Sequence, residues 1–202
     1  MEKSDSQDPR RNITLRKLVA CSAGQQARIR EIRNQPGIRA SMYTEHEISP
    51  EEHRKWLSTL TSDPRQIIFA VLDDQARALG IVSVNALDLL HQKSDWAFYL
   101  DETERGGLGA ALEFNFIDHV FNHLKIEKLN CEVIETNAAV VKLHKRFGFV
   151  EEGFRRENII KNGQRIGVHF LGLTRRDWTA SRNDVGEKYE ATLSRFSVTI
   201  ED

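Results

Sequence analysis

Hydrophobic and polar residues alternate in several short runs, and this period of two is typical of a half-buried β-strand. The runs 13–19 and 95–100 both follow it. Two further β-rich runs, 66–72 and 78–86, flank the pair Asp73-Asp74. Because short polar turns join antiparallel strands, this arrangement predicts a hairpin.

Other segments repeat their apolar residues every three or four positions, as an amphipathic helix does. Residues 25–33 have this pattern, and residues 107–124 show it over a longer stretch. A third helix is predicted from Ser49, which can cap it, with Pro50 in the first turn and Glu52 three residues after the cap.

The second half of the chain continues with a short apolar strand over 129–134 and a helix over 137–146, with Asn137 as its cap. Two strands, 149–156 and 165–173, then flank Asn162-Gly163. Asn-Gly favours the left-handed backbone of a tight hairpin turn, so these strands should pair.

The predicted order is strand, two helices, three strands, a long helix, strand, helix and two strands, which is an α/β chain. We expect a disordered tail over residues 1–11 and one domain over residues 12–178. After residue 178 the sequence turns polar, and we treat residues 179–202 as a C-terminal extension of uncertain structure.

Composition narrows the function classes. Twenty-nine basic and thirty acidic residues leave a net charge of −1, without the basic excess that nucleic-acid binding favours. Two cysteines, Cys21 and Cys131, are too few for a disulfide framework, and no Cys/His spacing predicts a metal site. Neither a signal peptide nor a membrane span is evident. We therefore expect a cytoplasmic protein without a membrane or nucleic-acid partner.

A glycine-rich turn joins the strand at 95–100 to the long helix. The turn is Glu104-Arg105-Gly106-Gly107-Leu108-Gly109-Ala110. Each glycine at a helix start costs about 1 kcal/mol of helix propensity relative to alanine. A bare backbone at the positive end of a helix can, however, bind a phosphate through its N–H groups. The simpler interpretation is a tight connection, and the loop alone does not choose between the two.

Two blocks together resemble the GCN5-related N-acetyltransferases. The loop is similar to that family's coenzyme A pyrophosphate motif, Gln/Arg-x-x-Gly-x-Gly/Ala, although Glu104 takes its first position and Arg105 would have to offset that charge. The block from Asn137 to Phe149 resembles Asn-x-x-Ala-x-x-Leu-Tyr-x-Lys-x-Gly-Phe. The resemblance covers roughly residues 13–178. It implies a mixed, mostly antiparallel twisted sheet, flanked by helices and splayed between its fourth and fifth strands.

The same resemblance implies acetyl-coenzyme A as cosubstrate, with no metal. Its pantetheine arm would pair with the backbone of 98–100 like an added strand. The residues expected to bind the cofactor are Phe98, Tyr99, Leu100, Arg105, Gly106, Gly107, Leu108, Gly109, Ala110 and Asn137.

Acetyl transfer needs a proton donor for the departing thiolate and a base for the amine. His144 stands where the family usually has a tyrosine, and we expect it to be the donor. Alternatively, His144 is a histidine of the core whose ring forms a hydrogen bond to a backbone carbonyl. Glu132, in an otherwise apolar strand, is the expected base and would have a raised pKa if partly buried. Glu135 is its rival, and both could instead be solvated or ion-paired.

The segment expected to shape the acceptor site resembles the acetyltransferases of pseudaminic-acid biosynthesis, which act on a 4-amine of a UDP-linked amino-dideoxy sugar. Arg33 and His53 would meet the diphosphate, while Met42, Tyr43 and Trp56 would pack on the uracil and sugar. Singly, each of these side chains has an ordinary structural alternative.

Two other function classes stay open. One is a related acetyltransferase acting on a protein N-terminus, a polyamine or an antibiotic. The other is a non-catalytic coenzyme A-binding sensor or scaffold, which His144 and the C-terminal segment keep open. A homodimer also remains open as the assembly.

Overall fold

The computed structural model describes residues 10–201. Most of the expected N-terminal tail lies outside the described residues, but Arg11 already begins the first strand. The elements in chain order are β1 (Arg11–Lys17), a 3₁₀ turn (Leu18–Ala20), α1 (Ala23–Arg33), α2 (Pro36–Ala40), α3 (Pro50–Leu60), β2 (Ile67–Leu72), β3 (Ala78–Asp88), β4 (Lys93–Leu100), α4 (Leu108–Asn122), β5 (Lys128–Ile134), α5 (Ala138–Arg146), β6 (Val150–Lys161), β7 (Gln164–Thr174), α6 (Arg175–Lys188), α7 (Glu190–Leu193) and β8 (Phe196–Glu201).

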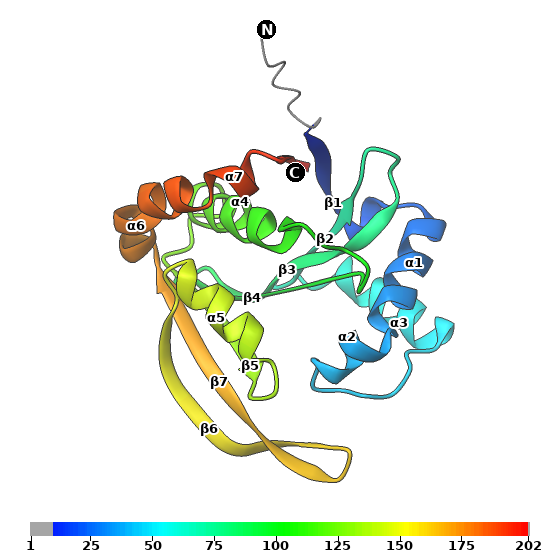
Figure 1. Cartoon of the computed structure of the whole chain (residues 1–202). Helices are drawn as coiled ribbons and strands as arrows, with labels where there is room; N and C mark the ends of the chain where they lie inside the picture. Colours follow the sequence, from blue (N-terminus) through cyan, green and yellow to red (C-terminus); the bar gives the residue numbers. More distant parts are fainter. Residues whose placement is uncertain (1–9, 202) are drawn as a thin grey trace, which may run out of the picture.

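The strands form one mixed sheet in the order β6-β7-β5-β4-β3-β2-β1-β8. Its pairs are antiparallel except β4–β5 and β1–β8, which are parallel. Helices α1 to α3 lie on one face and α4 to α7 on the other (Figure 1). The α/β class and the mixed, mostly antiparallel sheet predicted from the sequence are confirmed.

Local sequence signals account for most element ends. Ser49 accepts the N–H of Glu52, whose carboxylate accepts the N–H of Ser49, and Pro50 occupies the first turn of α3 as predicted. Asn162 and Gly163 both have positive φ, at 50° and 74°, so the β6–β7 hairpin turns where expected. Pro36 does more than end α1, because it begins the short helix α2.

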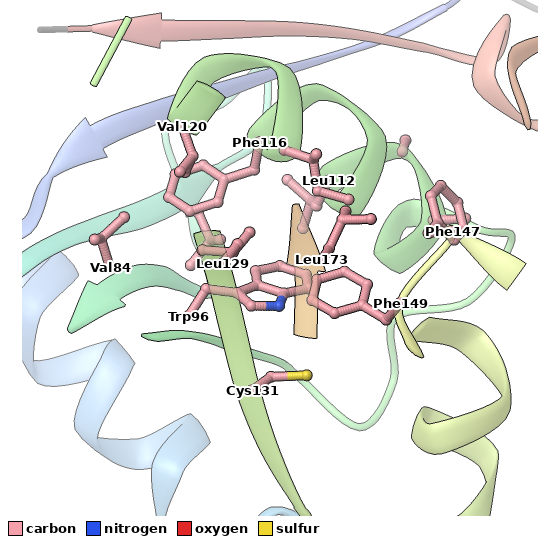
Figure 2. Packing of buried hydrophobic residues seen from close by; sticks show 14 of the residues in the cluster. Val84, Trp96, Leu112, Phe116, Val120, Leu129, Cys131, Phe147, Phe149 and Leu173 are labelled. Atoms are coloured by element: carbon pink, nitrogen blue, oxygen red, sulfur yellow. The ribbon is translucent and has the colours of Figure 1, made fainter. Parts of the chain in front are cut away.

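Two apolar cores hold the helices to the sheet. The larger lies under α4, α5 and α6, and the smaller lies between the sheet, α1 and α3. In the larger core the indole of Trp96 stacks between Phe116 and Phe149, at ring-centroid distances of 6.2 and 6.0 Å (Figure 2). Burial of this large aromatic fixes β4 against α4, and so places the loop between them.

Residues 179–201, which the sequence left as an extension of uncertain structure, have regular secondary structure, and residue 202 lies outside the described residues. Helix α6 continues through residue 178 to Lys188, and β8 pairs with β1 from Arg11↔Phe196 to Arg16↔Glu201. Phe196 is 7% exposed in the larger core. The segment therefore completes one edge of the sheet.

Candidate active site

The fourth and fifth strands diverge at the centre of the sheet. β4 and β5 pair only from Lys93↔Lys128 to Asp95↔Asn130. Beyond this point β4 stays paired with β3 as far as Leu100. The predicted splay is confirmed, and it leaves one backbone edge of β4 without a neighbouring strand among the described residues.

A cavity of about 280 Å³ occupies the splay. It brings together seven of the predicted site residues, which come from the loop after α2, from β4, β5 and α5. They are Met42, Phe98, Tyr99, Leu100, Glu132, Asn137 and His144.

His144 makes a buried pair with a residue that the sequence did not single out. Its Nδ1 lies 2.8 Å from Oε1 of Glu113 on α4, and the two side chains are 4% and 0% exposed. Burial raises the pKa of Glu113, and the contact with His144 opposes that rise. Glu113 Oε2 has no hydrogen-bond partner among residues 10–201. The partner of His144 is therefore a carboxyl group, and not the backbone carbonyl that the alternative interpretation expected.

Aromatic rings enclose the imidazole on its remaining sides. The ring centroids of Trp96 and Phe149 both lie 5.3 Å away, and that of Phe98 lies 6.3 Å away. With Nδ1 engaged by Glu113, Nε2 is the nitrogen left to meet a ligand in the cavity.

Glu132 is exposed, which is the solvated alternative that the sequence left open for it. The phenol of Tyr43 donates a hydrogen bond to its Oε2. Burial, and then this bond, raise the pKa of Tyr43, so the phenol keeps its proton. Tyr43 thus touches Glu132 and is 43% exposed. Glu135, also exposed, does not line the cavity.

The loop that carries Met42 and Tyr43 is fixed by the tip of the β6–β7 hairpin. The buried Nζ of Lys161 donates to the carbonyls of Arg39 and Met42, both at 2.8 Å, and lies 3.2 Å from Oε1 of Glu45. This contact joins segments far apart in the sequence. It holds one wall of the cavity.

A second cavity, of about 230 Å³, lies under α1 and α3 and shares Tyr99 with the first. Arg33, His53 and Trp56 line it, so the predicted acceptor set is divided between two cavities. Arg33 Nη1 and His53 Nε2 are buried and have no hydrogen-bond partner among the described residues. Burial, followed by Arg30, lowers the pKa of His53, which favours the neutral ring.

The glycine-rich loop has the backbone that only glycine adopts easily. Gly106 and Gly107 have φ of 83° and 93°, and α4 begins directly after them. The first turn of a helix leaves its N–H groups without intrahelical acceptors. Glu104 pairs with Arg11 at 3.1 Å. Arg105 donates to the backbone carbonyls of Glu102 and Glu104, so Arg11 rather than Arg105 pairs with the Glu104 carboxylate.

Asn137 takes the cap position of α5, but its side chain makes no capping hydrogen bond and lines the cavity instead. Within the described range 10–201, no group of three His, Cys, Asp or Glu side chains could hold a metal ion. No helix in that same range is long and apolar enough to cross a membrane.

Glu113 could have been found from the helix period. It is followed by Phe116, Ile117 and Val120, all buried at relative positions of three, four and seven. A carboxylate at the head of such a row must be paired. The missing information was its partner, which lies on a different helix.

These features fit a thioester cosubstrate of coenzyme A. The open edge of β4 can accept an extended arm, the cavity contains a buried histidine, and the positive-φ loop stands at the end of the strand. Comparison with known families agrees. Residues 23–170 match the acetyltransferase (GNAT) domain, and the chain belongs to this family of N-acetyltransferases.

Individual relatives are distant. L-amino acid N-acetyltransferase AaaT of Escherichia coli is 24% identical over 71% of this chain and 88% of its own. The putative ribosomal N-acetyltransferase YdaF of Bacillus subtilis is also 24% identical, but the match spans only 57% of that protein and 51% of this one. Among solved structures, spermidine N-acetyltransferase from Vibrio cholerae in complex with coenzyme A and spermine has a TM-score of 0.75. It is 23% identical, over 83% of this chain and 98% of the other.

Proposed function

We propose that this N-acetyltransferase takes its acetyl group from acetyl-coenzyme A and transfers it to a primary amine on a small molecule that also carries an anionic group. The cosubstrate supplies an activated acetyl thioester. Its extended arm would follow the open edge of β4 at 98–100, and the loop 105–110 would hold its pyrophosphate. Asn137 would contribute from the start of α5.

Two side chains have the proton-transfer roles in this proposal. His144 presents Nε2 to the cavity and donates a proton to the departing sulfur. Glu132, directly or through the Tyr43 phenol, accepts the proton of the attacking amine. Since Glu132 is exposed, it can pass that proton on to solvent.

One observation supports an acceptor substrate that carries an anionic group. Arg33 Nη1 and His53 Nε2 face the same cavity and are both buried without a partner. An unpaired buried donor is costly, and an anion or strong acceptor from a substrate would relieve that cost. Burial lowers the pKa of Arg33, which is the expected effect on a cation without a counter-ion.

The specific acceptor proposed is the 4-amine of a UDP-linked amino-dideoxy sugar of pseudaminic-acid biosynthesis, following the resemblance of the segment 33–56. The cavity under α1 and α3 would take an anionic group of that molecule. At about 230 Å³ it is smaller than the 300–1,000 Å³ typical of pockets that enclose a whole ligand. The nucleoside would therefore lie outside it.

A free amino acid is the second candidate. Its carboxylate would accept from Arg33 Nη1 and from the Nε2–H tautomer of His53, and the relative AaaT is named for this substrate class. A polyamine, as in the spermidine acetyltransferases, brings only positive charge toward Arg33. It would have to enter from the Glu132 side of the splay.

The deciding experiment incubates the protein and acetyl-coenzyme A with a UDP-linked amino sugar, the same sugar without UDP, free amino acids and spermidine. Thiol release is measured for each. We expect an anionic acceptor to be preferred. A free amino sugar or spermidine that reacts as well as the anionic acceptors would rule out the anion-binding role of the second cavity.

Arg33→Ala should raise the KM for the anionic acceptor about ten- to hundredfold, because charge-assisted hydrogen bonds contribute about 1.5–3 kcal/mol. Arg65→Ala is the matched control, since Arg65 is largely exposed and pairs with Asp63 away from both cavities. Equal KM values for the two variants would contradict the prediction.

A further inference from the structure

The pair formed by Glu113 and His144 is costly for the fold. Taking a carboxylate and an imidazolium out of water requires desolvation that their attraction repays only with good geometry and further hydrogen bonds. Glu113 Oε2 lacks such a bond among the described residues, although the side chain is fully buried. An apolar pair of similar volume would pack against Trp96 and Phe149 without this cost.

The geometry points to a use. Because Glu113 reaches Nδ1, it sets the orientation of the ring and leaves Nε2 toward the cavity. A carboxylate beside one nitrogen stabilises an imidazolium by charge and by hydrogen bonding. Such an arrangement is how a histidine is kept in one tautomer and orientation in other acyl-transfer sites.

We propose that Glu113 is a positioning residue for acetyl transfer, holding one proton within the Glu113–His144 pair so that Nε2–H is available to the departing thiolate. This inference rests on the proposed function. In the step, the carbon–sulfur bond of the thioester breaks and its electron pair goes to sulfur. The Nε2–H bond breaks as the S–H bond forms. The pair becomes a carboxylate bonded to a neutral imidazole and regains its proton from solvent through the cavity.

Few titratable groups face the pair. Cys131 on β5 lines the same cavity, and burial, followed by the charge of Glu113, raises the pKa of its thiol. β4 contributes the uncharged rings of Trp96 and Phe98, and the segment before β6 contributes Phe149. Asp95 of β4 and Glu132 of β5 act on Cys131 from further away. The proton balance is therefore set mainly by Glu113 and His144.

The test is Glu113→Gln, which keeps the shape and an acceptor oxygen for Nδ1–H but removes the charge. We expect kcat to fall about a hundredfold, within the range of general acid–base groups, while KM and acetyl-coenzyme A affinity change less than threefold. Asp118→Asn is the matched control, as Asp118 lies on the same helix and pairs with Arg182.

A second readout does not depend on turnover. Nitrogen NMR of His144 in the wild-type protein should show Nδ1 hydrogen-bonded to the carboxyl group and a proton on Nε2, and the Nδ1 signal should shift in Glu113→Gln. A wild-type ring whose Nε2 carries no proton at pH 6 to 8 would overturn the proposal, even if the variant does not fold. A folded variant with unchanged kcat would also overturn it. If the wild type acetylates no amine, the proposed function fails, whereas the NMR result still judges the pair.

Discussion

Two carboxylates stand near the reacting cavity in opposite environments. Glu113 is wholly buried and reaches the site only through His144, whereas Glu132 is exposed and bonded by Tyr43. A buried acid cannot exchange its proton freely with water, but an exposed one can. The two groups are therefore suited to different halves of the proton transfer, and their environments set that division.

The base assignment gives a prediction at a single residue. Glu132→Gln should lower kcat at least tenfold while leaving acetyl-coenzyme A affinity within twofold, since the amide cannot accept the amine proton. Glu135→Gln is the control, because Glu135 is equally exposed but lies outside the cavity. Steady-state kinetics at saturating cosubstrate measures both. Similar kcat values for the two variants would remove Glu132 from the mechanism.

The sequence identifies a single site residue when that residue belongs to a motif. His144 follows from the block beginning at Asn137, and the structure places both at the cavity. Arg33 and His53 also share a cavity. Glu113, the partner of His144, could not be predicted from the sequence in this way, because its contact with His144 depends on how two helices pack. The strand pattern likewise could not predict that Glu132 is exposed, because the pattern does not show which loop covers a face of the sheet.

At the level of elements, the connection from β4 to α4 is built as a rigid turn. Glu102 accepts the N–H groups of Gly37 and Ile38 at the start of α2. On the other side, α7 packs so closely that a Cβ on Gly107 would lie 2.3 Å from Cγ2 of Thr192. The loop thus has neighbours on two sides, and these fix the direction of its N–H groups.

This packing predicts the effect of a minimal change. Gly107→Ala combines an unfavourable φ of 93° with the clash against Thr192, so the loop must shift. We expect the dissociation constant for acetyl-coenzyme A, measured by calorimetry, to rise at least tenfold.

Gly163→Ala is the control for this change. Gly163 has a φ of 74° with nothing within 4 Å of the added Cβ, so it reproduces the backbone strain far from the loop. If the two alanine variants bind acetyl-coenzyme A equally well, the loop does not hold the pyrophosphate.

Element prediction succeeded where the signal was local. The Asn-Gly turn, the capping box of α3 and the long apolar period of α4 each act within a few residues. β8 alternates Phe196, Val198 and Ile200 with polar residues, so its strand character was visible. Its parallel pairing with β1 was not, because that depends on the path of the chain across the whole sheet.

For the whole molecule, the sheet is closed at one edge by strands from the two ends of the described chain. Phe196 is buried in the larger core and lies under the Arg11 guanidinium at 5.8 Å. Arg16 and Glu201 form an exposed ion pair along the same edge. Apolar burial by Phe196, more than the surface pair, should therefore hold β8 in place.

Phe196→Ala should lower the free energy of unfolding by about 3 kcal/mol, the lower end for a buried phenylalanine because an edge strand can relax. Ser197→Ala, on the exposed face of the same strand, should change it by less than about 0.5 kcal/mol. Denaturant titration measures both. A Phe196→Ala protein as stable as the control would show that β8 contributes little to the fold.

The pairing of β1 with β8 also bears on how quickly the protein folds and unfolds. Arg16 and Glu201 are 185 residues apart in sequence, so this contact closes a very long loop and should form after the more local hairpins β2–β3 and β6–β7. Contacts absent from the transition state act on the unfolding rate. Weakening β8 should then speed unfolding while refolding proceeds at nearly its normal rate. The last described strand would serve as a kinetic latch that lengthens the lifetime of the native protein.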